Sequence, residues 1–258
     1  MQQELENELY DKAEFLLEYA THLMGCGVHT SRVWRNTRRI GEAYGYEVEI
    51  GVFNLNIILT LRDKEHHAQI TEMAVVNHLP INFEHNARLS ALSWNCYDHH
   101  YDFENLKRRY YKIISTPRMS KWKTLLMASA ANASFCQLFG GDVVSVGIVF
   151  VATAVAFYLR SLMAGWHLNI YLQVLVAAFV SSIISSSSLL CESTSSIALA
   201  TSVLFLVPGV PLINGVIDTI EGHVLTGITR LVNAILVIFS LSIGLGITLV
   251  ITKGALVC

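Results

Sequence analysis

Residues 206–230 read LVPGVPLINGVIDTIEGHVLTGITR and lie in the apolar second half of a 258-residue chain. Five of them are residues that interrupt helices: Pro208, Gly209, Pro211, Gly215 and Gly222. The stretch also holds Asp218, Glu221 and Arg230, three of the six charged residues between Leu125 and Thr252. Broken helices at membrane depth are tolerated only where they face protein or a water-filled cavity. We therefore treat this stretch as the candidate site.

Polar residues in this stretch follow a helical spacing. Asn214, Asp218 and Glu221 stand at i, i+4 and i+7, which places an amide and two carboxylates on one face. Two carboxylates within a turn repel, so one could have a raised pKa and exchange a proton. Arg230 could balance the other or hold an anionic ligand. The alternative is a cytoplasmic loop between two spans, whose acids simply face water.

The composition indicates a membrane protein with a separate polar part. Charged residues make up 15% of the chain, against about 25% in soluble domains, and the mean hydropathy is +0.46. Of the 38 charged residues, 31 lie in residues 1–124, which sets the domain boundary. A net charge of −2 gives no reason to expect nucleic acid as a partner.

The second half, residues 116–258, is expected to form an all-α transmembrane bundle of about five helices. A basic run between Lys107 and Lys123 precedes the first apolar segment, so this flank is expected in the cytoplasm. The N-terminus is acidic rather than signal-like, which also places it there. An odd number of spans puts Cys258 outside. The expected spans are residues 124–139, 143–164, 168–190, 195–213 and 224–252.

The first half, residues 1–115, is expected to be a small cytoplasmic α+β domain. Helical spacing predicts helices at 5–24 and 30–44, each ending at a glycine. Alternation then predicts strands at 46–52, 54–61 and 68–76. Two further helices are expected near 83–97 and 103–114.

Other polar groups offer weaker signals. Asn132, in the first span, could hydrogen-bond a neighbouring helix or a substrate, and the serines at 181–188 favour close helix packing over a solute pathway. The pairs His66-His67 and His99-His100, the latter near Cys96, are taken as surface histidines. We therefore expect no metal and no cofactor. Standard catalytic motifs are also missing, so an enzyme is not expected.

The stretch at 206–230 resembles the threonine/serine exporter family, in which a proline-glycine turn precedes Asn-Gly, an Asp and a Gly-His. The resemblance extends to FLLEYATHLMGCGVHTSRV at residues 15–33, to FCQLFGGD at 135–142 and to AFYLRSLMAGWHLN at 156–169. The family has a long form and a split form, and this chain is similar to the larger subunit of the split form, associated with dicarboxylate (succinate) export in some bacteria.

The resemblance implies a subunit of a secondary exporter in the bacterial inner membrane. Its substrate would be a small carboxylate metabolite, either threonine and serine or a dicarboxylate, with protons as a candidate coupling ion. It also implies a small multi-span partner, further copies of this chain, or both, within lipid. A membrane-tethered ligand sensor that moves nothing is the alternative.

Overall fold

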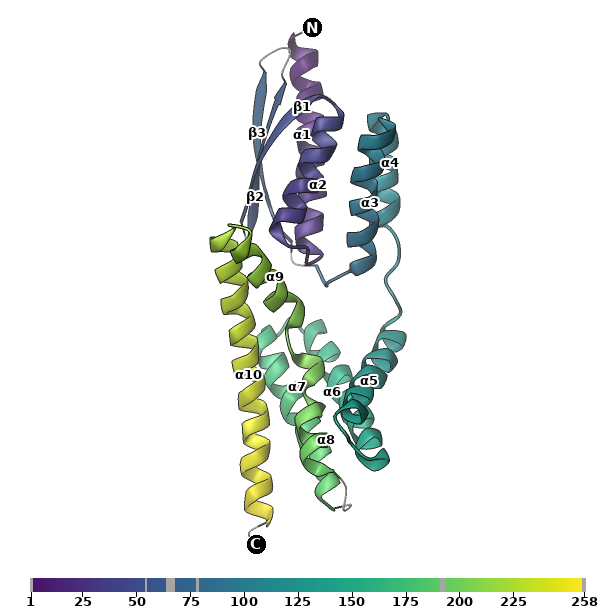
Figure 1. Ribbon diagram of the computed structural model, residues 1–258, viewed down its shortest axis with the longest axis vertical. Helices are drawn as coiled ribbons and strands as arrows, with labels where there is room; N and C mark the ends of the chain where they lie inside the picture. Colours follow the sequence, from purple (N-terminus) through teal and green to yellow (C-terminus); the bar gives the residue numbers. More distant parts are fainter. Residues whose placement is uncertain (1, 54, 64–67, 78, 191–193, 257–258) are drawn as a thin grey trace. The chain divides into compact units, whose positions relative to one another are not determined.

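The computed structural model describes residues 2–53, 55–63, 68–77, 79–190 and 194–256. Two compact units divide the chain (Figure 1). The first unit joins Met1–Pro117 with Val210–Val232, and the second joins Arg118–Gly209 with Asn233–Cys258. The candidate segment around Asp218 thus belongs to the same unit as the N-terminal part of the chain.

The first unit contains three layers in its N-terminal part. Helices α1 (Gln2–Gly25) and α2 (Thr30–Ala43) cover one face of a three-stranded antiparallel sheet, made of β1 (Tyr46–Val52), β2 (Asn56–Asp63) and β3 (Gln69–Val75) in that order (Figure 1). Helices α3 (Phe83–His99) and α4 (Phe103–Ile114) pack together, and α3 contacts α1 and α2. These elements match the ones predicted from the sequence.

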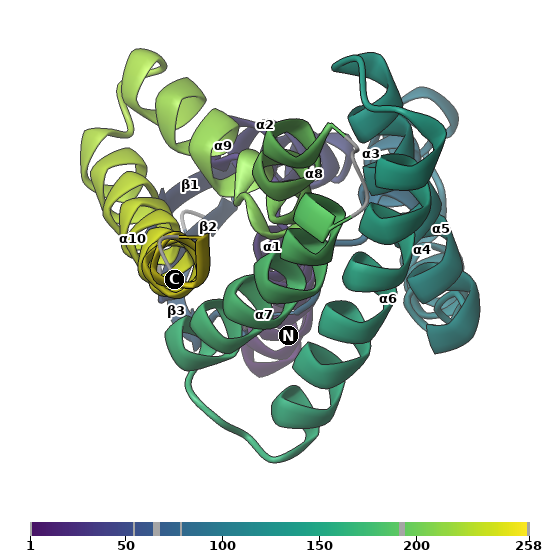
Figure 2. The same cartoon turned by 90° about the horizontal axis from the view of Figure 1, so that it is seen from below.

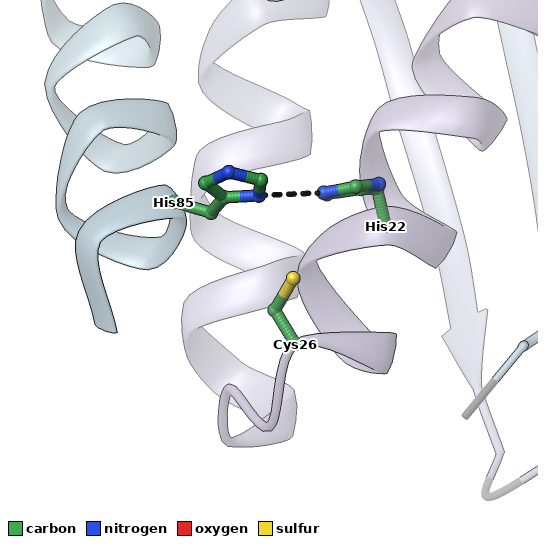
Figure 3. A group of neighbouring side chains, drawn as sticks. All are labelled: His22, Cys26 and His85. Carbon is green, nitrogen blue, oxygen red and sulfur yellow. Dashed lines mark hydrogen bonds between the residues drawn. The ribbon is translucent and has the colours of Figure 1, made fainter. Parts of the chain in front are cut away.

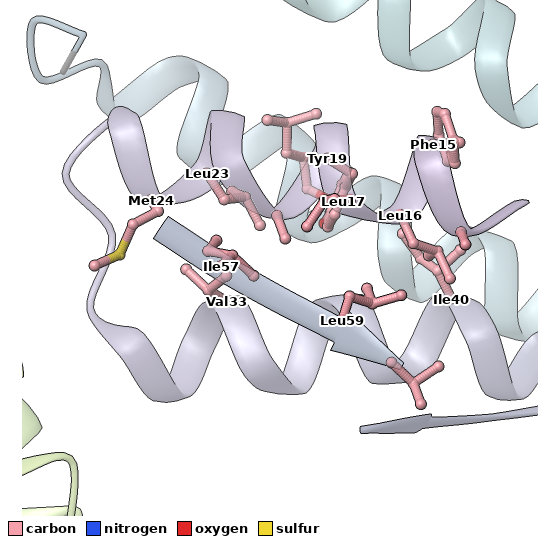
Figure 4. Packing of buried hydrophobic residues seen from close by; sticks show 14 of the residues in the cluster. Phe15, Leu16, Leu17, Tyr19, Leu23, Met24, Val33, Ile40, Ile57 and Leu59 are labelled. Carbon is pink, nitrogen blue, oxygen red and sulfur yellow. The ribbon is translucent and has the colours of Figure 1, made fainter. Parts of the chain in front are cut away.

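Alternation along β2 explains how the sheet meets the helices. Ile57, Leu59 and Leu61 are fully buried, whereas Ile58 between them faces outward and is 37% exposed. Side chains of a strand point alternately to opposite faces, so one face of β2 is apolar from Ile57 to Leu61. Figure 4 shows Ile57 and Leu59 directed at the layer formed by α1 and α2, where Val33 lies.

The second unit is helical. It contains α5 (Lys121–Leu138), α6 (Val143–Gly165), α7 (Ile170–Ser185), the 3₁₀ turn η1 (Ser186–Leu190), α8 (Ser195–Ser202), the 3₁₀ turn η2 (Leu204–Leu206) and the greater part of α10 (Val224–Leu256). Helix α6 packs between α5 and α7, as Figure 2 shows.

Small and hydroxyl side chains let these helices approach closely. Ala156, Ala177 and Ala178 are fully buried at the contact of α6 and α7 with their neighbours. The Ser181 hydroxyl donates to the Ser202 carbonyl over 2.7 Å, and the hydroxyls of Ser182 and Thr248 are 2.6 Å apart. The serine cluster therefore joins helices, as the packing interpretation expected.

The structure supports fewer than five spans by length and apolarity. Within the described residues, Val143–Gly165, Ile170–Leu189 and Val224–Thr252 meet both conditions, and Ser195–Leu206 with Gly209–Ile220 adds a fourth if this broken pair is one span. Helix α5, the expected first span, does not meet them, since two lysines, Asn132 and Gln137 reduce its apolar character. The expected fourth span at 195–213 is wrong as one continuous helix, because Pro208 separates η2 from α9 (Gly209–Ile220).

Much of this apolar surface is not covered by the chain itself. Only 28%, 39% and 22% of the three spans is buried inside the structure. The remaining apolar surface needs lipid or another subunit to cover it. Cys258, His66 and His67, for which expectations were stated, lie outside the described residues.

We predict that Leu59→Ala lowers the free energy of unfolding by about 2–5 kcal/mol, because it removes a fully buried side chain between sheet and helices. Ile58→Ala, on the outer face of the same strand, should cost no more than about 1 kcal/mol. Denaturant unfolding of the full chain in detergent, followed by tryptophan fluorescence, measures both. Equal losses would contradict the described orientation of β2.

Candidate functional site

Helices α9 and α10 form a tight hairpin around the candidate residues. Gly222 ends the α9 segment with a φ of +91°, a left-handed conformation that suits glycine. A Cβ atom on Gly215 would lie 2.8 Å from the Leu231 side chain and 3.1 Å from the Gly227 carbonyl oxygen, so a side chain at position 215 would clash with α10. Glycine at 215 thus serves close packing.

The expected helix breaks are therefore corrected in part. Pro208 does stand between helices, and Gly222 lies in the turn after α9. Gly209 instead begins α9, and Pro211 lies in its first turn, where proline's missing N–H leaves no helical hydrogen bond unmade. Gly215 is in the middle of the helix.

Asp218 is the centre of the site. Its side chain is 0% exposed, and its Oδ1 accepts a hydrogen bond of 2.7 Å from the backbone N–H of Thr30, the first residue of α2. Its Oδ2 lies 3.0 Å from Nη1 of Arg230 in α10. The His29 side chain makes no capping bond to α2, so Asp218 supplies the negative group that the start of this helix favours.

We call residues 26–29, which link α1 to α2, the α1–α2 turn. Two other predicted residues, Arg230 and Asn214, bind this turn. Arg230 Nη2 donates to the Val28 carbonyl over 2.9 Å, and Asn214 Nδ2 donates to the Gly27 carbonyl over 2.8 Å. Asn214, Asp218 and Arg230 are therefore brought together, by hydrogen bonds to the turn and by the ion pair.

Glu221 is separated from this group, contrary to the expectation of two interacting carboxylates. It lies past the end of α9, with Oε2 3.5 Å from His29 Nδ1 and Oε1 3.7 Å from Arg35 Nη1. Its side chain is 35% exposed. The Ser31 hydroxyl, together with His29 and Arg35, holds the pKa of Glu221 below its usual range. Each acid thus has its own arginine neighbour, Arg230 for Asp218 and Arg35 for Glu221.

His29 has a lowered pKa for a different reason. Burial is the largest cause and the cation of Arg32 is the next, and together they outweigh the attraction of Glu221. A neutral imidazole is therefore favoured beside Glu221 near neutral pH. Arg35 remains the fully charged neighbour of this acid.

Asn132 lies in the second unit and not with the other four residues. Its Nδ2 donates to the Thr153 hydroxyl over 2.7 Å and to the Ser202 carbonyl over 3.5 Å, while Oδ1 has no hydrogen-bond partner. Of the two alternatives, the structure contains the helix-to-helix hydrogen bond.

Asp142, which precedes α6, is hydrogen-bonded to Thr194, which precedes α8. Its Oδ1 accepts hydrogen bonds from the Thr194 hydroxyl at 2.6 Å and from the Thr194 N–H at 3.0 Å. Hydrogen bonds from Ser145 and Thr194 hold the pKa of Asp142 well below its usual range. It ties the start of α6 to the start of α8.

A hollow of about 370 Å³ lies in the second unit, between α8 and α10. None of its lining residues is charged, so it does not suit an anionic ligand. The lining comprises Leu189, Ser195, Ser196, Leu199, Ala200, Leu245, Leu249 and Thr252.

Chemically, the site around Asp218 is a carboxylate-binding arrangement. A guanidinium and the N-terminus of a helix both meet one carboxylate, and such groups bind anions well when water is excluded. The carboxylate present is the protein's own. The part of the α1–α2 turn in this site could not be predicted, because the glycine that follows residues 5–24 indicates only the end of a helix.

Comparisons with known proteins agree over nearly the whole chain. A family model described as "Putative threonine/serine exporter" matches residues 14–252. A protein of Escherichia coli strain K12 named "Probable succinate transporter subunit YjjP" is 31% identical over 244 residues, covering 89% of this chain and 90% of that protein. A protein of the same name in Klebsiella aerogenes is 28% identical, covering 93% of each. No solved structure matches.

We predict that stability falls as the pH drops from 7 to 5, and that His29→Gln reduces this fall. Folding lowers the pKa of His29 from 6.5, so below that pH the unfolded chain binds the proton more readily. Glu221 adds a loss only in more acidic solution, because folding lowers its pKa from 4.5.

Thermal unfolding of the full chain at a series of pH values measures this effect. His99→Gln, which changes an exposed histidine of α3, is the matched control and should keep the original dependence. An unchanged slope in His29→Gln would refute the assignment.

Proposed function

Because this chain belongs to the threonine/serine exporter family, we propose that it is a subunit of a secondary transporter that exports a small carboxylate metabolite across the bacterial inner membrane. The role is transport rather than catalysis. Neither the family nor the named relatives supports the alternative of a membrane-tethered sensor.

One observation carries the proposal: Arg230 and the N-terminus of α2 hold a buried carboxylate. A substrate carboxylate has the same two acceptor oxygens as Asp218. If Asp218 takes up a proton, it releases Arg230, and a metabolite carboxylate can take its place. Loss of that proton then restores the internal pair and displaces the metabolite. Asp218 is thus the proposed coupling group, and Arg230 the proposed substrate-binding group.

A dicarboxylate suits this arrangement better than an amino acid. Beside the Asp218–Arg230 pair there is a second acid with a cationic neighbour, Glu221 with Arg35, at 3.7 Å. The two carboxylates of such a substrate could replace Asp218 and Glu221 beside the two arginines. Threonine or serine has one carboxylate, and its ammonium group would be repelled by the second arginine. The name of the two relatives, which mentions succinate, supports this choice. Asn214 is proposed to orient the substrate, and we assign Asn132 a supporting role at helix contacts.

The way the first unit is assembled supports a proposal for the membrane topology. We propose that residues 1–115 are cytoplasmic and that residues 116–258 form the membrane domain. The chain leaves the first unit at Pro117 and returns to it at Val210. A unit on one side of the membrane requires an even number of crossings between these points. Helices α6 and α7 supply two, and the proposed five-span arrangement adds one crossing at α5 and one at α8 with η2, which do not meet the conditions for a span by themselves. Helix α10 is then the fifth, which places Cys258 outside.

A partner subunit is part of the proposal. The relatives are named as subunits, and the spans of this chain leave most of their apolar surface uncovered. We propose that a small multi-span protein, further copies of this chain, or both cover it.

Reconstitution into liposomes, with the partner subunit, tests the function. We expect flux of succinate, threonine or serine, and Asp218→Asn should reduce it at least tenfold, about 1.4 kcal/mol in a barrier, and change its pH dependence. Asparagine can still accept the Thr30 N–H but cannot exchange a proton. Arg230→Gln should raise the substrate concentration needed for flux, and Glu221→Gln, which is partly exposed, should have a smaller effect than either.

Folding must be checked, because breaking a buried ion pair can cost about 3–5 kcal/mol. Gel filtration and circular dichroism of each variant in detergent distinguish misfolding from loss of transport. Normal, pH-responsive flux by folded Asp218→Asn would refute the coupling role. Ligand binding without flux in the intact assembly would instead favour a sensor.

The topology has its own test. An impermeant thiol reagent applied to intact cells should label Cys258, provided the other four cysteines are replaced by serine. Protection of Cys258 in cells, with labelling in inverted vesicles, would show that the number of crossings is even.

A further inference from the structure

Three metal-binding side chains meet beside the α1–α2 turn. His22 lies in the last turn of α1, Cys26 follows that helix, and His85 lies in the first turn of α3. One ligand atom from each lies within 4.8 Å of the others. Figure 3 shows the sulfur of Cys26 directed at the gap between the two imidazole rings. Sixty-three residues separate the two histidines, so sequence spacing alone gives no sign of the group.

The distance between the two rings matches metal coordination. His22 Nε2 and His85 Nδ1 are 3.3 Å apart. A tetrahedral metal with bonds of about 2.0–2.1 Å to nitrogen holds two such atoms roughly 3.3–3.4 Å apart. The same separation serves a hydrogen bond in the metal-free protein, so the distance between the two nitrogens need not change when a metal binds.

The surroundings also favour a bound ion. Cys26 is 2% exposed and His85 is 5% exposed, so an ion held between them would be shielded from bulk water. The group contains no carboxylate, which makes it a poor site for magnesium or calcium.

We propose that His22, Cys26 and His85 form a Zn²⁺ site on the cytoplasmic part of this chain. Two imidazoles and one thiolate are the donor set that zinc prefers, and three protein ligands leave a fourth position for water. This proposal does not depend on the transport function.

A metal at this site would hold the α1–α2 turn, which Asn214 and Arg230 also bind. The Cys26 carbonyl accepts a hydrogen bond of 3.3 Å from Asn82, whose side chain caps α3. The next two carbonyls, of Gly27 and Val28, accept from Asn214 and Arg230. A metal at Cys26 would therefore fix the α1–α2 turn from the opposite end.

Metal binding to the full chain in detergent tests the proposal. The protein, prepared without a histidine tag and stripped with a chelator, should bind one Zn²⁺ per chain in competition with a chromogenic chelator. Co²⁺ in place of Zn²⁺ should give a thiolate-to-metal charge-transfer band. This spectrum needs no variant, so it does not depend on how any substitution folds.

Matched substitutions locate the site. Cys26→Ser and His85→Ala should each weaken binding at least about 100-fold. Cys96→Ser, another buried thiol of the same unit, and His99→Ala, an exposed histidine of α3, should leave it unchanged. Absence of the cobalt band in the wild-type protein, or unchanged affinity in Cys26→Ser, would overturn the proposal.

Discussion

The buried carboxylate of Asp218 is the constraint on which the first unit depends. A fully buried charge is costly unless it is paired and hydrogen-bonded. Asp218 receives both, from Arg230 and from the N–H of Thr30 at the start of α2. Arg230 in turn binds the carbonyl of Val28. The α9–α10 hairpin is thereby joined to the N-terminal helices of the first unit through directional polar contacts.

The same arrangement supports the proposed exchange of carboxylates. Replacing a buried ion pair by another carboxylate at the same cation preserves the charge balance, whereas opening it without a replacement leaves an uncompensated guanidinium. The close approach of α9 and α10 at Gly215 and Gly227 keeps Asp218 and Arg230 opposite each other. Glu221, by contrast, is partly exposed to solvent and lies beside His29 and Arg35.

Local patterns predicted most of the elements, because hydrophobic periodicity depends on neighbours in the chain. The alternation around Leu59 correctly indicated a strand with one buried face, and the helix of Asn132 was found although it is too polar to qualify as a span. The break near Pro208 was placed in the right stretch, but Gly215 was taken as an interruption where it serves packing. The partners of Asp218 could not be predicted, since Thr30 is 188 residues away.

That separation has a consequence for biosynthesis. During translation, the helices and sheet of residues 1–117 emerge long before Arg230, which reaches back over 202 residues to Val28. N-terminal segments generally fold first as the chain is made, and distant contacts form late. The α1–α2 turn must therefore wait, without its buried ion pair, until the intervening helices have entered the bilayer. Completion of the first unit would therefore follow the insertion of the helices between Pro117 and Val210.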